Sequence, residues 1–151
     1  MAALHSLFVA HGAYAKKIYP IETAHGTIYD VNSDRAAILN ELGKTNIPSL
    51  VVIPEGLALN YLLAKPTPLA YYTFTPPEAA DPRAEEKILA DFVAKKPEWI
   101  AVIPRDMSEF GSRGFGVDYD QRLAAYIRMH YAIAGGWNRP HFSLALLHKS
   151  R

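Results

Sequence analysis

The sequence predicts an α/β fold, a single-domain mixed sheet with a parallel centre, flanked by helices, and an antiparallel hairpin at its C-terminal edge. Residues 49–54 (SLVVIP) and 99–104 (WIAVIP) are short, uninterrupted apolar runs of the kind buried on both faces of a parallel sheet. An amphipathic helical pattern lies between them, as a parallel crossover requires. Two strand-like runs, 132–137 and 142–148, close the chain and predict the edge hairpin.

The chain length fits one domain preceded by a short segment. A chain of 151 residues has the size of one ordinary domain. Its first fifteen residues carry no Lys, Arg, Asp or Glu, and Lys16 and Lys17 follow. We therefore expect residues 1–17 to be a linker or an ordinary first element, and residues 18–151 to form the α/β domain.

The first elements of the domain have clear borders. Residues 19–29 mix β-branched and aromatic side chains around Gly26, which predicts an extended strand or a hairpin. Asn32 or Ser33 then caps a helix that ends at Gly43. Its predicted buried face consists of Ala37, Ile38 and Leu42.

The middle of the chain alternates strands and helices. Residues 49–54 are the predicted central strand, and residues 55–63 form a short helix directly after it. Residues 69–75 (LAYYTFT) predict another strand from their aromatic and Thr content. Asp81 is the expected cap of the next helix, and Pro82 takes its first position. The buried stripe of that helix is Ile88, Leu89, Phe92 and Val93, and Pro97 stops it.

The last third contains a polar loop and a final helix before the edge hairpin. Residues 99–104 predict a strand parallel to 49–54, and residues 105–117 form a glycine-containing loop. Asp118 is the expected cap of the last helix. The buried stripe of that helix recurs at helical spacing and consists of Tyr119, Leu123, Tyr126, Ile127 and His130.

Composition excludes several classes of function. Sixteen Lys and Arg against fifteen Asp and Glu leave a net charge of +1, and no basic run is present, so nucleic acid is not an expected partner. The lack of cysteine excludes disulfide scaffolds and thiolate metal sites. No apolar run approaches the roughly 20 residues of a spanning helix, so the chain as given is expected to be soluble.

Enzymatic signatures are also missing from the sequence. It contains no GxxxxGK[ST] phosphate loop, no GxSxG elbow and no HExxH helix. The six histidines show no close metal-ligand spacing with one another. We therefore expect no cofactor and no metal site, and we name no catalytic residue.

Two segments are candidates for binding because polar residues follow the two predicted parallel strands, where open α/β sheets place their ligands. In the first segment, Glu55 and Gly56 enter a helix that also carries Asn60. The N–H groups of a helix N-terminus attract anions, and Gly56 would let a ligand approach the main chain. Glu55 would instead repel a phosphate, so a purely structural helix entry stays open beside ligand binding.

The second candidate segment is the loop after residues 99–104. It contains Arg105, Asp106, Glu109 and Arg113. Mixed charges in such a loop are typical of binding elements, but they are equally typical of solvated connectors whose charges neutralise one another. The two candidate segments together predict weak, salt-sensitive ligand binding near Glu55, Asn60, Arg105 and Arg113.

Four stretches of the chain resemble a known family. The string IPEGLALNYLLAKPTPLAYYTFTPPE at 53–78 is similar to the C-terminal soluble region of bacterial integral-membrane glycosyltransferases of the C type, the group of the dolichyl-phosphate-mannose protein mannosyltransferases and related lipid A sugar transferases. ETAHGTIY at 22–29, PEWIAVIPRDMSEFG at 97–111 and GVDYDQRLAAYIRMHYAI at 116–133 resemble further elements of that region in the same order.

The resemblance implies a non-catalytic, extracytoplasmic domain that assists acceptor or donor recognition. Its parent would be a membrane transferase of the bacterial inner membrane that uses a polyprenyl-phosphate-sugar donor. The expected partners are the membrane-embedded part of that parent chain and a glycan or lipid-linked sugar. Residues 1–17 would then be a membrane-exit segment. The family's catalytic acids lie between membrane helices that this sequence lacks, so none is carried over.

Two alternatives from other classes stay open. One is a small free-standing hydrolase that uses Asp106 and Glu109 as a carboxylate pair. The other is a protein-interaction module that docks a partner through residues 69–75 or through the terminal hairpin edge.

Overall fold

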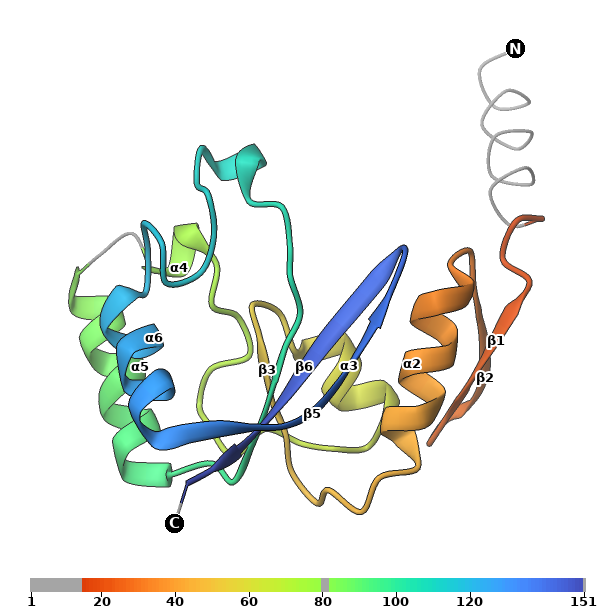
Figure 1. The fold of residues 1–151 in the computed structure, drawn as a ribbon, viewed down its shortest axis with the longest axis horizontal. Coiled ribbons are helices and arrows are strands. Elements are labelled where there is room, and N and C mark those ends of the chain that lie inside the picture. The colour runs from red at the N-terminus through yellow and green to blue at the C-terminus, as the bar shows by residue number, and fades with distance from the viewer. Residues whose placement is uncertain (1–14, 80–81, 151) are drawn as a thin grey trace.

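The computed structural model describes residues 15–79 and 82–150, which adopt the predicted α/β fold (Figure 1). This part of the chain contains a four-stranded mixed sheet and a separate two-stranded hairpin. Most of the predicted segment 1–17 lies outside the described residues, and so does the predicted cap Asp81.

The four-stranded sheet has the order β3–β4–β6–β5. Its strands are β3 (Val51–Ile53), β4 (Trp99–Val102), β5 (Tyr131–Arg139) and β6 (Phe142–Lys149). β3 and β4 are parallel, whereas β6 pairs antiparallel with both β4 and β5. The parallel pair and the antiparallel C-terminal hairpin at the edge are therefore confirmed.

Strand β3 lies at the end of the sheet opposite β5, and the chain around residues 72–74 covers its outer side. The Gly56 amide donates to the Tyr72 carbonyl over 2.8 Å, and the Phe74 amide donates to the Pro54 carbonyl over 2.7 Å. The strand predicted over residues 69–75 is thus wrong, because only an isolated bridge between Glu55 and Thr73 forms. Pro54 has no N–H to donate to a ladder, and a helix starts soon after it, so the pairing cannot extend.

The N-terminal hairpin consists of β1 (Tyr19–Thr23) and β2 (Gly26–Asp30), as predicted. Gly26 has a φ of 110°, which a residue with a side chain rarely adopts, and this allows the tight connection. Helix α2 (Ser33–Gly43) follows. Asn32 caps it, because its side-chain oxygen accepts from the Arg35 amide over 3.0 Å. Ala36, rather than the predicted Ala37, shares the buried face of α2.

Helices cover both faces of the sheet (Figure 1). Helix α2 and α3 (Leu57–Leu62) lie on the face that presents Val52 and Ala101. Helices α5 (Pro82–Lys95) and α6 (Gln121–His130) lie on the other face. Strands β3 and β4 are therefore buried from both sides, which explains their uninterrupted apolar sequences. The short helix α4 (Pro76–Ala79) precedes α5.

Two predicted helix faces differ in detail from the structure. In α5, Ile88 and Phe92 are buried, but Val93 is exposed at the edge of the stripe. In α6, Leu123 and Ile127 are buried, whereas His130 is exposed. His130 is the last residue of its helix, where the chain turns into β5, so the helical period no longer places it on the core.

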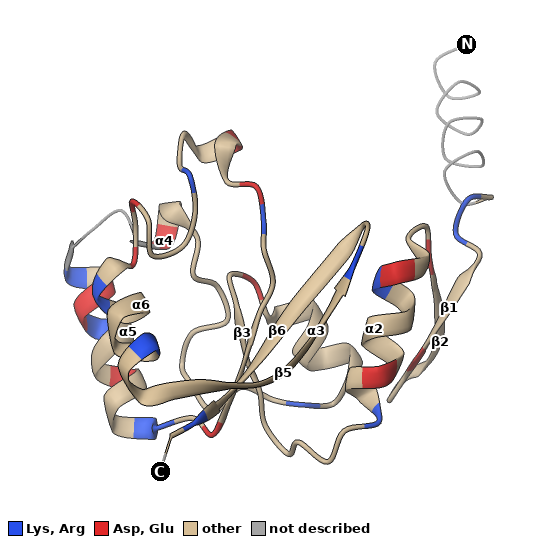
Figure 2. Cartoon of the chain, in the orientation of Figure 1, with Lys and Arg blue, Asp and Glu red and all other residues tan. Residues whose placement is uncertain are grey.

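Charged residues gather on the helices and on the connection between β4 and α6, while the four-stranded sheet carries few (Figure 2). In that connection, the 3₁₀ turn η1 (Ser108–Phe110) is the only regular element besides isolated bridges among the described residues.

None of the helices within residues 15–79 and 82–150 has both the length and the apolar character needed to cross a membrane.

Candidate functional site

The candidate site lies at the carboxyl ends of the parallel strands β3 and β4. Because the strands are parallel and adjacent, the residues that follow them emerge side by side. The Arg105 guanidinium forms ion pairs with the carboxylates of Glu55 and Glu109, the second over 2.6 Å between Nη2 and Oε1. The structure thus joins the two segments that the sequence singled out.

Arg113 lies on the same connection but is much less restrained. Its only ion pair among the described residues is with Asp118, over 3.4 Å, and its side chain is 77% exposed. Asp118 accepts hydrogen bonds from the Ser112 hydroxyl and from the amides of Arg113 and Gly114. The Ser112 hydroxyl and then these amides lower the pKa of Asp118 to about 2.

Asp118 therefore orders the loop and does not cap the last helix, so the predicted cap is wrong. The N-terminal amides of α6 are satisfied by another element. The Glu85 carboxylate of α5 accepts from the amides of Arg122 and Leu123 over 2.7 and 3.3 Å. Tertiary packing of α5 on α6 supplies the cap that the local sequence was expected to supply.

Gly56 and Asn60 hold helix α3 against β3. The buried Asn60 amide donates to the carbonyls of Leu50 and Lys65 over 2.7 and 2.6 Å. A Cβ at Gly56 would lie 2.5 Å from the Asn60 Oδ1. Gly56 is thus explained by close packing inside the fold, and its own N–H already donates to the Tyr72 carbonyl. Close packing therefore accounts for Gly56, whereas the Asn60 Oδ1 is buried without a partner among the described residues.

Asp106 shapes the start of the loop. Its carboxylate accepts from the Ser108 amide over 2.9 Å, and the hydrogen bonds from Ser108 lower the pKa of Asp106. Glu109, the other member of the predicted catalytic carboxylate pair, forms an ion pair with Arg105. Two carboxylates that act as acid and base need pKa values that differ, one of them raised. The structure gives Asp106 the opposite shift.

A cavity of about 260 Å³ lies beside the ion-pair cluster. It is lined by Ile53, Pro54, Val102, Ile103, Pro104, Arg105, Met107, Arg113, Gly114, Phe115, Val117 and Tyr119. Its walls are mainly apolar, and the Arg105 and Arg113 side chains add the charged groups. Such a mixture of apolar walls with a few polar groups is typical of sites for small ligands.

Tyr119 lines this cavity, but its hydroxyl has almost no accessible surface. Tyr119 is buried, and no described residue hydrogen-bonds its hydroxyl. Burial and the nearby carboxylates of Asp120 and Asp118 raise the pKa of Tyr119 to about 12. The hydroxyl is therefore protonated at neutral pH and can both donate and accept. The sequence predicted Tyr119 only as a core residue, because helical spacing cannot show whether a buried hydroxyl finds a partner.

Asp120 is a second group that the sequence did not single out. It stands at the N-cap position of α6 with a φ of 48°, and both of its carboxylate oxygens are buried without a partner among the described residues. Burial, and then the charge of Glu85, raise the pKa of Asp120 to about 6. No local pattern distinguishes it from the exposed acids nearby.

Both charged residues that line the cavity are already paired with carboxylates. Arg105 forms ion pairs with Glu55 and Glu109, and Arg113 forms one with Asp118. Within the described ranges, no cluster of three or more His, Asp or Glu side chains is arranged to hold a metal ion.

No family model, curated protein or solved structure matches this chain. What the site can do must therefore come from its own geometry. That geometry comprises a small cavity with apolar walls, an unpartnered phenol and a rim of ion-paired carboxylates.

Proposed function

We propose that this chain is a non-catalytic recognition domain that binds a neutral, hydroxyl-bearing ligand, the acceptor glycan of a membrane glycosyltransferase. The observation that carries the proposal is the Tyr119 hydroxyl, buried without a partner where its residue lines the cavity at the ends of β3 and β4. A buried hydroxyl without a partner costs roughly 1–3 kcal/mol. The hydroxyl has almost no accessible surface, so the proposal includes a turn of the Tyr119 side chain toward the cavity, where a hydrogen bond to a ligand hydroxyl recovers this cost.

Charge favours a neutral ligand over a phosphate. Both guanidiniums at the cavity are already paired, Arg105 with two carboxylates and Arg113 with one. A phosphate entering this cavity would meet the carboxylates of Glu55 and Glu109 and would have to displace one of them. Sugar hydroxyls, in contrast, can donate to those carboxylates without disturbing the ion pairs. Of the two roles that the family resemblance implies, acceptor recognition is therefore better supported than recognition of the donor phosphate.

The same geometry favours binding over hydrolysis. A hydrolase that used Asp106 and Glu109 would need one carboxyl group with a raised pKa as general acid. The pKa of Asp106 is lowered, and Glu109 is held by Arg105. The hydrolase alternative stays a prediction, which a glycosidase assay of the wild-type chain and its Asp106→Asn variant would test.

An NMR titration tests the binding proposal. We expect methyl glycosides of neutral hexoses, at millimolar concentration, to shift the backbone amides of Arg105, Gly114 and Tyr119. Tyr119→Phe should weaken this binding several-fold while the remaining spectrum stays native. Inorganic phosphate at the same concentration should leave these amides unshifted. Shifts caused by phosphate and not by the glycosides, or shifts by neither, would overturn the proposal.

The link to a membrane transferase has a separate test. The resemblance implies that the natural reading frame encodes, before Met1, several spans of about 18 or more apolar residues. A natural reading frame without such spans would refute the transferase parent. It would leave the glycan-binding proposal to be judged by the titration alone.

A further inference from the structure

A second hollow adjoins the cavity on the same side of the sheet. It is a trough of about 510 Å³ over β4, β6 and β5. Its lining includes Val102, Pro104, Ile133, Asn138, Ser143 and Ala145. Val102 and Pro104 line both hollows, so trough and cavity are neighbours.

The trough is open because the β5–β6 hairpin extends beyond α5 and α6, the helices that cover this face of the sheet. No residue of α5 or α6 lines it. In Figure 1, the β5–β6 hairpin extends away from these two helices, toward α2. Ile133, near the start of the trough, is 78% exposed although its neighbour Tyr131 is buried in the core. The sheet thus presents an open apolar surface directly beside the candidate site.

The side chains of the trough suit a neutral polar chain. None of its lining residues is ionisable, so it offers no charged partner to a phosphate or a carboxylate. Asn138 and Ser143 add an amide and a hydroxyl to walls that are otherwise apolar. A hydrocarbon chain lying there would remove water from these two polar groups without replacing their hydrogen bonds. Sugar rings present C–H faces together with hydroxyl groups, and so match both kinds of wall.

The volumes of the two hollows also favour a ligand that occupies both of them. Sites for small molecules typically measure about 300–1,000 Å³, and the cavity alone falls below that range. The cavity and the trough together lie within it. A ligand whose end enters the cavity would therefore have room to continue along the trough.

We propose that the trough is a second subsite, which binds the following sugar units of a neutral oligosaccharide whose terminal unit occupies the cavity. This inference rests on the proposed function and deepens it, because it assigns a chain length to the ligand. It also gives the edge hairpin a role in binding.

Calorimetric titration with neutral oligosaccharides of one to four units tests the inference. We expect the affinity of the wild-type chain to rise about tenfold between one and three units. Ile133→Ser removes an exposed apolar wall, and Ala145→Trp fills the trough, because Ala145 pairs with Val102 and shares its face of the sheet. Both variants should bind the monosaccharide like the wild type and lose the increase with length.

A matched control and distinct outcomes keep the test decisive. Met129 on α6 is 72% exposed and does not line the trough, so Met129→Ser should retain the increase with length. Monosaccharide binding without any increase in the wild-type chain would overturn the second subsite and leave the proposed function standing. No binding of any saccharide would overturn both. Binding of the neutral isoprenoid alcohol farnesol that Ile133→Ser abolishes, without length-dependent saccharide binding, would reassign the trough to an apolar chain.

Discussion

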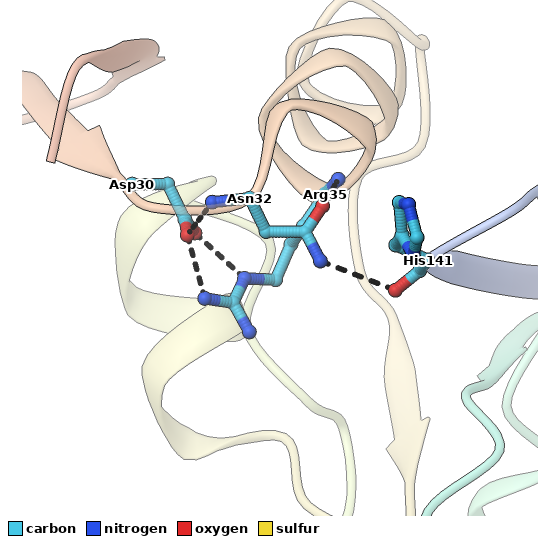
Figure 3. A network of polar contacts seen from close by, with 4 residues as sticks. All are labelled: Asp30, Asn32, Arg35 and His141. Carbon is cyan, nitrogen blue, oxygen red and sulfur yellow. Dashed lines mark hydrogen bonds and ion pairs between the residues drawn. The ribbon is translucent and has the colours of Figure 1, made fainter. Parts of the chain in front are cut away.

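Two polar clusters of this molecule differ in whether their buried groups have partners. At the junction of β2, α2 and the turn before β6, the Asp30 carboxylate accepts two hydrogen bonds of 2.6 Å from the Arg35 guanidinium (Figure 3). The Asn32 side chain donates to the His141 carbonyl over 3.1 Å in the same network. At the ends of β3 and β4, by contrast, Tyr119 and Asp120 keep buried oxygens without a partner among the described residues.

The two carboxylates differ in the sign of their pKa shifts. Burial alone would raise the pKa of Asp30, but the hydrogen bonds from Arg35 and Asn32 outweigh it, and the pKa lies below its ordinary value. Burial without such bonds raises the pKa of Asp120 to about 6. Ionised Asp30 therefore stabilises the fold, whereas ionised Asp120 destabilises it. The first cluster holds elements together, whereas the second keeps buried polar groups unpaired, one of them on Tyr119, which lines the cavity.

Removing the partnered carboxylate should have the largest effect on stability. Asp30→Ala leaves the partly exposed Arg35 guanidinium without its acceptor, and we expect it to reduce the free energy of unfolding at pH 7 by about 2–3 kcal/mol, measured by urea denaturation. Because the folded pKa of Asp30 is lowered, this loss should shrink as the pH falls below the ordinary value of 3.8.

The control for that variant is an ion pair without burial. Arg122 and Glu86 form an ion pair of 3.1 Å, but both side chains are more than half exposed. Arg122→Ala should therefore change the free energy of unfolding by less than about 1 kcal/mol. Equal losses for the two variants would show that burial and bidentate bonding do not set the first cluster apart.

The unpartnered carboxylate should produce the opposite dependence on pH. The folded pKa of Asp120, about 6, lies above its ordinary value of 3.8, so protonation favours the folded state. This contribution is fully present below pH 3.8 and is lost as the pH rises through 6. The stability difference between Asp120→Asn and the wild-type chain should thus shift by about 2–3 kcal/mol in favour of the variant between pH 4 and pH 8. Unfolding curves at several pH values measure it, and a difference that does not change with pH would contradict the shift.

Gly56 tests whether close packing stabilises the fold within the candidate site. An added Cβ would lie 2.5 Å from the Asn60 Oδ1 and 3.1 Å from the Val52 Cβ, so we expect Gly56→Ala to destabilise the fold by about 1–2 kcal/mol. Gly135→Ala, where the added Cβ has no neighbour within 4 Å, is the matched control and should change stability little. If thermal unfolding shows no loss for Gly56→Ala, close packing does not explain this glycine.

The sequence predicts the elements of this fold better than the partners of its side chains. Strand-like runs such as 51–53 and 99–102 are recognisable because burial on both faces leaves a continuous apolar signal. The predicted cap at Asp118 is wrong because Glu85, distant in sequence, satisfies the helix instead. Glu55 and Arg105 could be expected to meet because both follow parallel strands. No periodicity, however, shows that the Tyr119 hydroxyl is buried without a partner, because that property depends on the whole fold.

Two buried tyrosines show the same difference between a buried group with a partner and one without. We expect the smallest effect on stability from them, but the most direct test. The Tyr131 hydroxyl donates to the Pro97 carbonyl over 2.7 Å, whereas the Tyr119 hydroxyl has no partner among the described residues. Tyr131→Phe should therefore lower the free energy of unfolding by about 1 kcal/mol, because it leaves a buried carbonyl without its donor. Tyr119→Phe removes only an unsatisfied group and should leave stability unchanged or raise it slightly. If chemical denaturation shows the larger loss for Tyr119→Phe, its hydroxyl is already engaged within the fold and is not available to a ligand.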